Sequence, residues 1–294
     1  MSDRRIVPLR LGAVEYLNAR PLVYRLERRQ GFEVRYDVPS RCADLLHEGA
    51  IDVGLIPSIE YLRAPREAEY RIVPDLAIGS NGPVASVMLY TIRPVSRVRS
   101  LALDVSSRTS VALVRVFCAR RFHIDPALET RGPDLPSMLA GADAALIIGD
   151  AALLLDDASL GQVAGEVARK RGEPRSAIEI EAIDLGQQWT ELTGLPFVYA
   201  FWAGRSGVLT AGDIAALQET RDAGVAHVKE VAREYFQTQP ERQELGERYL
   251  RDNIRYGLGD AERAGLETFY RYAAEAGVVE SPGPVRFFDA DTVL

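Results

Sequence analysis

The stretch that decides the fold is Val14-Glu15-Tyr16-Leu17-Asn18-Ala19-Arg20-Pro21-Leu22. A short apolar strand over 10–14 precedes it, and helical spacing over 19–29 follows it. Asn18 occupies the N-cap position of that predicted helix, and Pro21 is tolerated in its first turn, where a missing N–H costs nothing. Because ligands of open α/β sheets bind at the carboxyl ends of strands, Asn18 either caps the helix or lies in a binding site.

The next segments repeat this alternation of strand and helix. Strands are predicted at 32–36 and 53–56, and Ser40 and Gly49 cap and end the helix between them. Pro57 suits the first turn of another helix after the second of these strands. Such alternation predicts βαβ units with a parallel sheet, so the predicted fold class is α/β.

A second lobe is predicted from residue 94 to residue 195. It contains strands at 101–105 and 144–148 and follows a strand over 84–91 that we expect to be the last of the first lobe. The apolar run 197–202 then returns to the first lobe, which comprises residues 1–93 plus 196–294 and ends in helices. The chain is expected to pass from one lobe to the other near 90–94 and again near 196–202. Two such connections predict two hinged α/β lobes with a ligand cleft between them.

Composition excludes several classes of function. The chain is 47% hydrophobic and 26% charged, typical of a globular enzyme, and its net charge of −7 argues against a nucleic-acid or anionic-membrane surface. Cys42 and Cys118 lack a C-x-x-C partner, so we expect buried thiols with no metal or redox role. We find no secretory signal and no membrane-spanning run, which predicts a cytoplasmic protein.

Polar residues at strand ends are the candidates for a binding site. Ser86 interrupts an apolar strand, so its hydroxyl either faces the cleft or bonds to backbone. The run Ser107-Arg108-Thr109-Ser110 lies between a strand and a helix, where N–H groups and hydroxyls suit a carboxylate or simply cap the helix. The other candidates, each with a purely structural alternative, are Arg41 as a carboxylate partner, Ser58 at a helix start and Asp150 at a strand end.

Motifs for metal or nucleophilic chemistry are missing from the sequence. It has three histidines, His47, His123 and His227, on or beside predicted helices, where a packing or surface role is expected. There is no Ser-His-Asp spacing, no H-E-x-x-H and no P-loop. An enzyme with this sequence is expected to use neither a metal nor a covalent nucleophile, and no cofactor is predicted.

The opening stretch, from Tyr16 to Leu22, resembles the signature of the chorismate dehydratases of the futalosine route to menaquinone. Further matches follow in order at Pro39-Ser40-Arg41, Asp52-Val53-Gly54-Leu55-Ile56-Pro57-Ser58, Gly82-Pro83-Val84-Ala85-Ser86-Val87 and 104–110. The resemblance covers nearly the whole chain and is strongest before residue 150. It implies the periplasmic-binding-protein type II fold, in which two α/β lobes close over a small molecule.

The resemblance also implies a reaction, the loss of water from the dicarboxylate chorismate to give 3-[(1-carboxyvinyl)oxy]benzoate. Asn18 and Ser86 would lie at the reacting edge, while Arg41, Ser58, residues 107–110 and Asp150 would bind substrate. The base is left open, and the enolpyruvyl carboxylate of the substrate is one candidate. The alternatives are a small-anion receptor of the same fold and the sister 1,4-dihydroxy-6-naphthoate synthase. The oligomeric state is not predicted.

Overall fold

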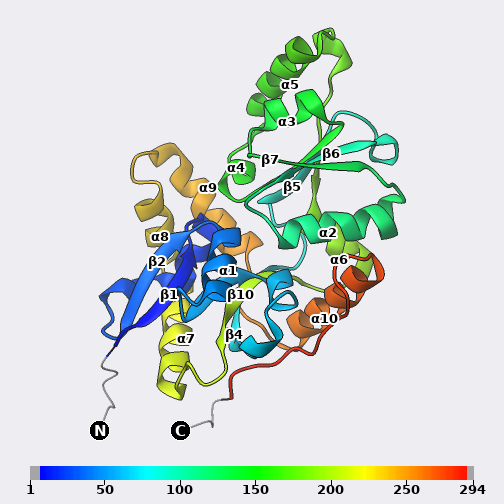
Figure 1. The fold of residues 1–294 in the computed structure, drawn as a ribbon. Coiled ribbons are helices and arrows are strands. Elements are labelled where there is room, and N and C mark those ends of the chain that lie inside the picture. Colours follow the sequence, from blue (N-terminus) through cyan, green and yellow to red (C-terminus); the bar gives the residue numbers. More distant parts are fainter. Residues whose placement is uncertain (1–6, 290–294) are drawn as a thin grey trace.

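The computed structural model describes residues 7–289 and contains two separate five-stranded sheets. Helices cover both sheets, with α1 and α7 on the first, and with α2 on one side of the second and α3 and α5 on the other (Figure 1). This arrangement confirms the expected α/β class with two lobes.

The first sheet has the strand order β2-β1-β3-β10-β4. Its strands are β1 (Leu9–Val14), β2 (Phe32–Asp37), β3 (Val53–Pro57), β4 (Tyr70–Ser80) and β10 (Phe197–Arg205). β1 runs parallel to β2 and β3, as the alternating pattern predicts, whereas β10 runs antiparallel to β3 and β4. The carboxyl ends of β1 and β3 therefore meet at one edge of this sheet.

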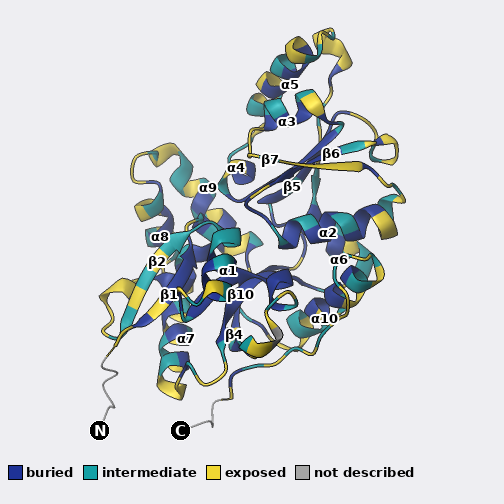
Figure 2. Ribbon diagram, viewed as in Figure 1, coloured by how far each residue is buried: buried dark blue, intermediate teal, exposed yellow. Residues whose placement is uncertain are grey.

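The second sheet repeats the pattern with the order β7-β6-β8-β5-β9. Its strands are β5 (Val87–Thr91), β6 (Ser100–Asp104), β7 (Ala127–Arg131), β8 (Ala144–Ile148) and β9 (Glu181–Asp184). β6 runs parallel to β7 and β8, and β5 runs antiparallel to β8 and β9. Figure 2 shows that the edge strand β7 is exposed, whereas β5 is largely buried inside the sheet.

The chain changes sheets twice. The return of residues 197–202 to the first sheet is confirmed, because β10 pairs there with β3 and β4. The placement of the strand over 84–91 in the first lobe was wrong, since β5 pairs with β8 and β9. The first change of sheet thus lies between Ser80 and Val87, before the predicted boundary at residue 93. An apolar strand carries no local signal of which sheet it joins.

Ten α-helices lie within residues 7–289, including α3 and α6, where no helix was predicted. They are α1 (Pro39–Glu48), α2 (Thr109–Phe117), α3 (Leu135–Gly141), α4 (Asp150–Leu153), α5 (Asp157–Arg171), α6 (Leu185–Thr193), α7 (Ala211–Ala226), α8 (Val228–Tyr235), α9 (Gln243–Arg248) and α10 (Asp260–Glu275). Short 3₁₀ or π segments are η3 (Ser58–Tyr61), η4 (Arg66–Ala68), η5 (Val95–Arg97), η6 (Cys118–Phe122), η7 (Arg175–Ala177), η8 (Pro240–Arg242) and η9 (Tyr249–Asn253).

The segment after β1 differs from the predicted helix. It forms two 3₁₀ helices, η1 (Leu17–Val23) and η2 (Leu26–Arg28), separated at Arg25, whose φ of 57° is left-handed. Asn18 lies inside the first turn of η1, and the preceding Tyr16 holds the cap position without a side-chain bond. The N-cap interpretation of Asn18 was therefore wrong, and its amide is not used to start a helix.

The larger hydrophobic core runs through both lobes. Trp189 of α6 is fully buried and packs edge-on against Phe197 and Phe269, with ring centroids 5.1 and 6.1 Å away. The C-terminal coil closes on the first lobe, where Phe288 N–H donates to Ile72 O at 2.9 Å. Phe288 is the buried residue of this coil, and residues 290–294 lie outside the described part.

Candidate active site

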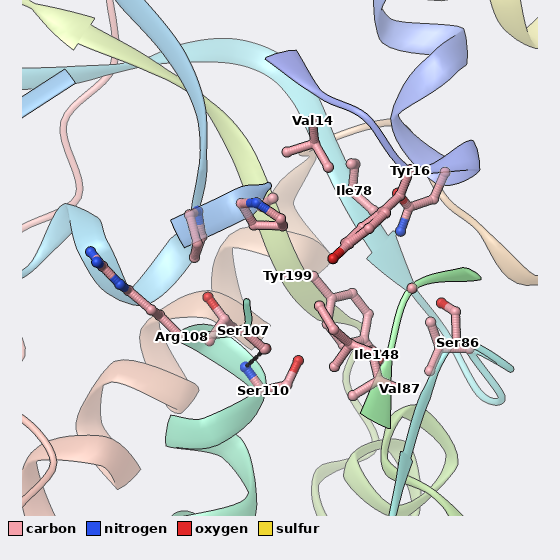
Figure 3. Close-up of a pocket in the computed structure, with 17 residues that line it drawn as sticks. Val14, Tyr16, Ile78, Ser86, Val87, Ser107, Arg108, Ser110, Ile148 and Tyr199 are labelled. Carbon is pink, nitrogen blue, oxygen red and sulfur yellow. Dashed lines mark hydrogen bonds between the residues drawn. The ribbon is translucent and has the colours of Figure 1, made fainter. Parts of the chain in front are cut away.

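A pocket lies between the lobes, where the carboxyl ends of β1 and β3 face the start of α2. It encloses about 520 Å³ of empty space, part of it open to solvent. Figure 3 shows Tyr199 between Ser110 on one side and Ser86 on the other. The lining residues come from both lobes and are Val14, Tyr16, Asn18, Pro39, Pro57, Ile78, Val84, Ser86, Val87, Ser107, Arg108, Thr109, Ser110, Ile148, Gly149, Tyr199 and Ala200.

Asn18 and Ser86 lie in this pocket together. The Ser86 hydroxyl is buried and accepts a hydrogen bond from the hydroxyl of Tyr249 at 2.7 Å. The Asn18 backbone carbonyl accepts from the hydroxyl of Tyr256 at 3.0 Å, while its side-chain oxygen Oδ1 is buried with no partner. An unpaired buried acceptor costs about 1–3 kcal/mol, so it marks a place where a ligand donor is favoured.

The backbone just before Ser86 is strained. Ala85 has φ of 62°, a left-handed conformation that costs a non-glycine residue about 1–2 kcal/mol. The carboxylate of Asp184 holds it by accepting from the N–H groups of Ala85 at 2.7 Å and Val84 at 3.0 Å. It also accepts from Gln187 N–H at 3.0 Å and so caps α6. Asp184 therefore links the two segments in which the chain passes from one sheet to the other. By holding the backbone of residues 84 and 85, it also fixes where the Ser86 side chain points.

The segment 107–110 forms the start of α2 at the pocket. Ser107 Oγ accepts from the N–H of Ser110 at 3.2 Å, and Thr109 Oγ1 accepts from the N–H of Ile59 in the other lobe at 3.3 Å. The first turn of a helix leaves N–H groups unsatisfied, and its dipole favours an anion. Hydroxyls and a helix start on this side of the pocket suit a carboxylate, as the sequence predicts.

Arg108 lines the pocket but is engaged elsewhere. Its guanidinium pairs with Glu60 Oε2 and with Asp44 Oδ1, both at 2.8 Å, and both carboxylates belong to the first lobe. Figure 3 shows the guanidinium on the side of the pocket away from Ser86. Among the described lining residues it is the only charged one. Anion binding in this pocket therefore rests on dipoles and hydroxyls, while Arg108 joins the lobes.

Comparison with known proteins decides the family. A sequence model of the family described as menaquinone biosynthesis matches residues 9–275. The chain belongs to this menaquinone biosynthesis family. A curated relative from Thermus thermophilus, named chorismate dehydratase, is 32% identical over 89% of this chain and 94% of its own length. The family resemblance drawn from the opening stretch is confirmed.

Solved structures show the fold that this family member adopts. An Archaeoglobus fulgidus protein superposes with a TM-score of 0.70 at 15% identity, covering 92% of this chain and 98% of that one. The periplasmic aliphatic sulphonate binding protein SsuA of Escherichia coli gives 0.56 at 15% identity, covering 99% and 96%. At such identities the likeness shows the fold alone, and it confirms the predicted periplasmic-binding-protein-like architecture.

Three predicted binding residues of this family member, Arg41, Ser58 and Asp150, are not among the residues that line the pocket. Arg41 pairs with Glu48 Oε1 at 3.0 Å on α1, and its side chain is 41% exposed. Ser58 is fully buried, and its hydroxyl donates to Val198 O at 2.8 Å. The structure thus gives Arg41 a surface ion pair and Ser58 a packing role beside Thr109, and neither contacts the pocket directly.

Asp150 also lies beside the pocket and joins the lobes. Its carboxylate accepts from the N–H of Leu17 at 3.2 Å and from the hydroxyl of Tyr235. Burial raises the pKa of Asp150 above that of a free aspartate. Because α4 belongs to the second lobe, this carboxylate fastens it to the segment that carries Asn18.

Sequence reasoning missed three tyrosines at the site. Tyr16 stood inside the opening stretch, but nothing there indicated that its hydroxyl would donate to Ser106 Oγ at 3.1 Å across the lobes. Burial raises the pKa of Tyr16 to about 12, so it remains a neutral donor. Tyr199 stands in an apolar run, and Tyr249 stands among the charged residues of the segment 247–252. Their partners are far away in sequence, so no local pattern could have found them.

Residues 7–289 provide neither a metal-binding cluster nor a helix that could span a membrane. No cluster of three or more His, Cys, Asp or Glu side chains is placed to hold a metal ion. No helix in the same range has the length and apolar character needed to cross a bilayer. Cys42 and Cys118 are buried free thiols, as expected, and burial raises the pKa of Cys42 to about 12.

Proposed function

We propose that this protein is a carbon–oxygen lyase that dehydrates chorismate to 3-[(1-carboxyvinyl)oxy]benzoate, the first step of the futalosine route to menaquinone, in the cytoplasm. The observation that carries the proposal is the convergence of Asn18 and Ser86 on one interlobe pocket, opposite the hydroxyl-rich start of α2. These are the residues of the motifs shared with the chorismate dehydratases. The identity to a curated chorismate dehydratase over most of the chain supports the same substrate.

The chemistry required is the removal of a ring proton followed by the loss of hydroxide. The ring hydrogen beside the enol ether is acidic through conjugation with the ring carboxylate, and its removal gives a delocalised dienolate. Expulsion of the neighbouring hydroxide then makes the ring aromatic, and the proton and hydroxide leave together as water. Negative charge grows on the ring carboxylate, where the start of α2 and the hydroxyls of 107–110 offer fixed dipoles.

The proton acceptor in this proposal is the substrate itself. The described lining residues include no aspartate, glutamate, histidine or lysine that could serve as a base. The enolpyruvyl carboxylate of chorismate is attached next to the reacting carbon, so a closed pocket need only orient it and exclude water. Asn18 and Ser86 then contact the reacting edge of the ring.

The test is a direct assay with purified protein, chorismate and an excess of chelator, followed by mass spectrometry for the dehydrated product. Asn18→Ala and Ser86→Ala should lower kcat on the order of 10²-fold, because each removes a preorganised contact to developing charge. Ser176→Ala serves as the matched control and should keep the wild-type rate, because Ser176 is exposed and does not line the pocket.

Each other outcome contradicts a separate part of the proposal. Absence of product from folded wild-type protein would refute the lyase and favour a receptor of the same fold. Turnover of the later pathway intermediate instead of chorismate would favour the naphthoate synthase. Product that disappears with chelator would contradict the expectation of metal-free chemistry, and near-normal kcat in both alanine variants would remove Asn18 and Ser86 from the reacting edge.

A further inference from the structure

Tyr249 lies directly behind the pair of residues at the reacting edge. It is the first residue of the π-helical segment η9 (Tyr249–Asn253) and is 2% exposed. Its hydroxyl donates to Ser86 Oγ at 2.7 Å, yet it does not line the pocket. Single π turns inside helices often mark functional sites, because the extra residue redirects a side chain.

The hydrogen bond from Tyr249 determines that the Ser86 hydroxyl is left as a hydrogen-bond donor. Burial raises the pKa of Tyr249, so its hydroxyl keeps its proton and acts as the donor. A serine hydroxyl has one proton to donate, and Tyr249 occupies one of its two lone pairs. Within residues 7–289 no acceptor takes the Ser86 proton, which leaves it available to a ligand.

Asn18 supplies an open acceptor in the same pocket. Its side-chain oxygen Oδ1 is buried and has no partner, so it remains available to a ligand donor. Tyr256, which follows η9, holds the backbone carbonyl of Asn18 at 3.0 Å. Tyr249 therefore fixes the Ser86 hydroxyl, and Tyr256 fixes the backbone of Asn18.

A donor beside an acceptor suits only some ligand groups. An acceptor such as Asn18 Oδ1 repels a carboxylate oxygen, whereas an alcohol can donate to it and accept from Ser86 at the same time. The pair therefore fits a hydroxyl, and the carboxylates belong at the start of α2.

We propose that Tyr249 is a positioning residue that makes Ser86 the donor to the departing hydroxyl of the substrate, while the unpaired Asn18 Oδ1 in the same pocket is its acceptor. This inference rests on the proposed function. Ser86 would donate a hydrogen bond to the oxygen as its bond to carbon breaks and would keep its own proton, because the proton removed from the ring completes the departing water. Tyr249 stays neutral and touches no reacting atom.

Tyr249→Phe tests the role, since it removes only the hydroxyl and keeps the ring. We expect kcat to fall on the order of 10-fold with little change in KM. The ring still packs, but the Ser86 hydroxyl loses the hydrogen bond that keeps it a donor to the ligand. The matched control is Tyr61→Phe. Tyr61 is a buried tyrosine whose hydroxyl bonds backbone groups of Tyr70, Pro284 and Arg286, and its variant should keep wild-type kcat.

A double-mutant cycle separates positioning from a merely structural role. Adding Tyr249→Phe to Ser86→Ala should cause almost no further loss of kcat, since the tyrosine acts through the serine. An equal loss in both backgrounds would overturn the coupling, as would wild-type kcat in folded Tyr249→Phe protein. Wild-type protein that forms no product would instead overturn the proposed function and this role with it, so the two failures are distinguishable.

Discussion

Gly149 offers a sharp test of how the lobes close. It follows β8, with φ of 63° and ψ of −145°, a combination that is essentially restricted to glycine. A Cβ atom at this position would lie 2.9 Å from Cδ2 and Cε2 of the Tyr16 ring. Because Tyr16 belongs to the first lobe and Gly149 to the second, Gly149→Ala places a methyl group between the two lobes at the pocket.

The expected cost has two parts. Forcing alanine into this backbone conformation costs about 1–3 kcal/mol. Displacing the Tyr16 ring also breaks its hydroxyl bond to Ser106, worth about 1 kcal/mol, for a total of about 2–4 kcal/mol. For 294 residues the unfolding entropy is about 0.6 kcal/mol per kelvin, so Tm should fall by about 3–6 °C. KM should rise, because the lobes no longer meet around the substrate.

The assay combines thermal unfolding with steady-state kinetics, and Gly172→Ala is the control. Gly172 ends α5 with φ of 68°, and a Cβ there would have no atom within 4 Å. It should lose about 1–2 kcal/mol from backbone strain alone and leave KM unchanged. Gly149→Ala with the Tm and KM of wild type would refute the argument, because neither the strain nor the interlobe contact would then exist.

Two further predictions concern the anion side of the pocket and pH. Thr109→Val and Ser110→Val should each raise KM for chorismate, and kcat should fall too if charge grows there, whereas unchanged kinetics in both would remove 107–110 from the site. Burial lowers the pKa of His47, so the stability that its neutral ring contributes is complete above about pH 6.5 and is lost as pH falls through the folded-state value. Wild-type Tm should therefore drop more than that of His47→Gln between pH 7 and pH 5, and parallel curves would argue against this origin.

Asn18 shows that a residue can be placed at the pocket for a wrong local reason. Its position after an apolar strand suggested a helix cap, yet it lies within a 3₁₀ turn whose preceding residue is Tyr16. Pro21 and the left-handed Arg25 prevent the long helix that the spacing predicts. The pocket location followed from strand-end topology, which does not depend on the type of helix.

The arginines show the limit of reading charge from sequence. Arg41 and Arg108 both stood in matched motifs as carboxylate binders. The structure pairs Arg41 with Glu48 and Arg108 with Asp44 and Glu60. Whether an arginine meets a substrate or a neighbouring carboxylate depends on the fold around it, because guanidinium groups bind both equally well.

Local sequence determined what depends on neighbours along the chain. The alternation of strands and helices, the end of α1 at Gly49 with its φ of 74°, and the hydroxyl-rich start of α2 all follow from periodicity, caps and turns. Tertiary structure alone decided which sheet β5 joins, which carboxylates take the arginines, and that Tyr249 meets Ser86 from 163 residues away. Those outcomes depend on which surfaces pack together, and many distant segments carry the same local pattern, so only the folded chain selects among them.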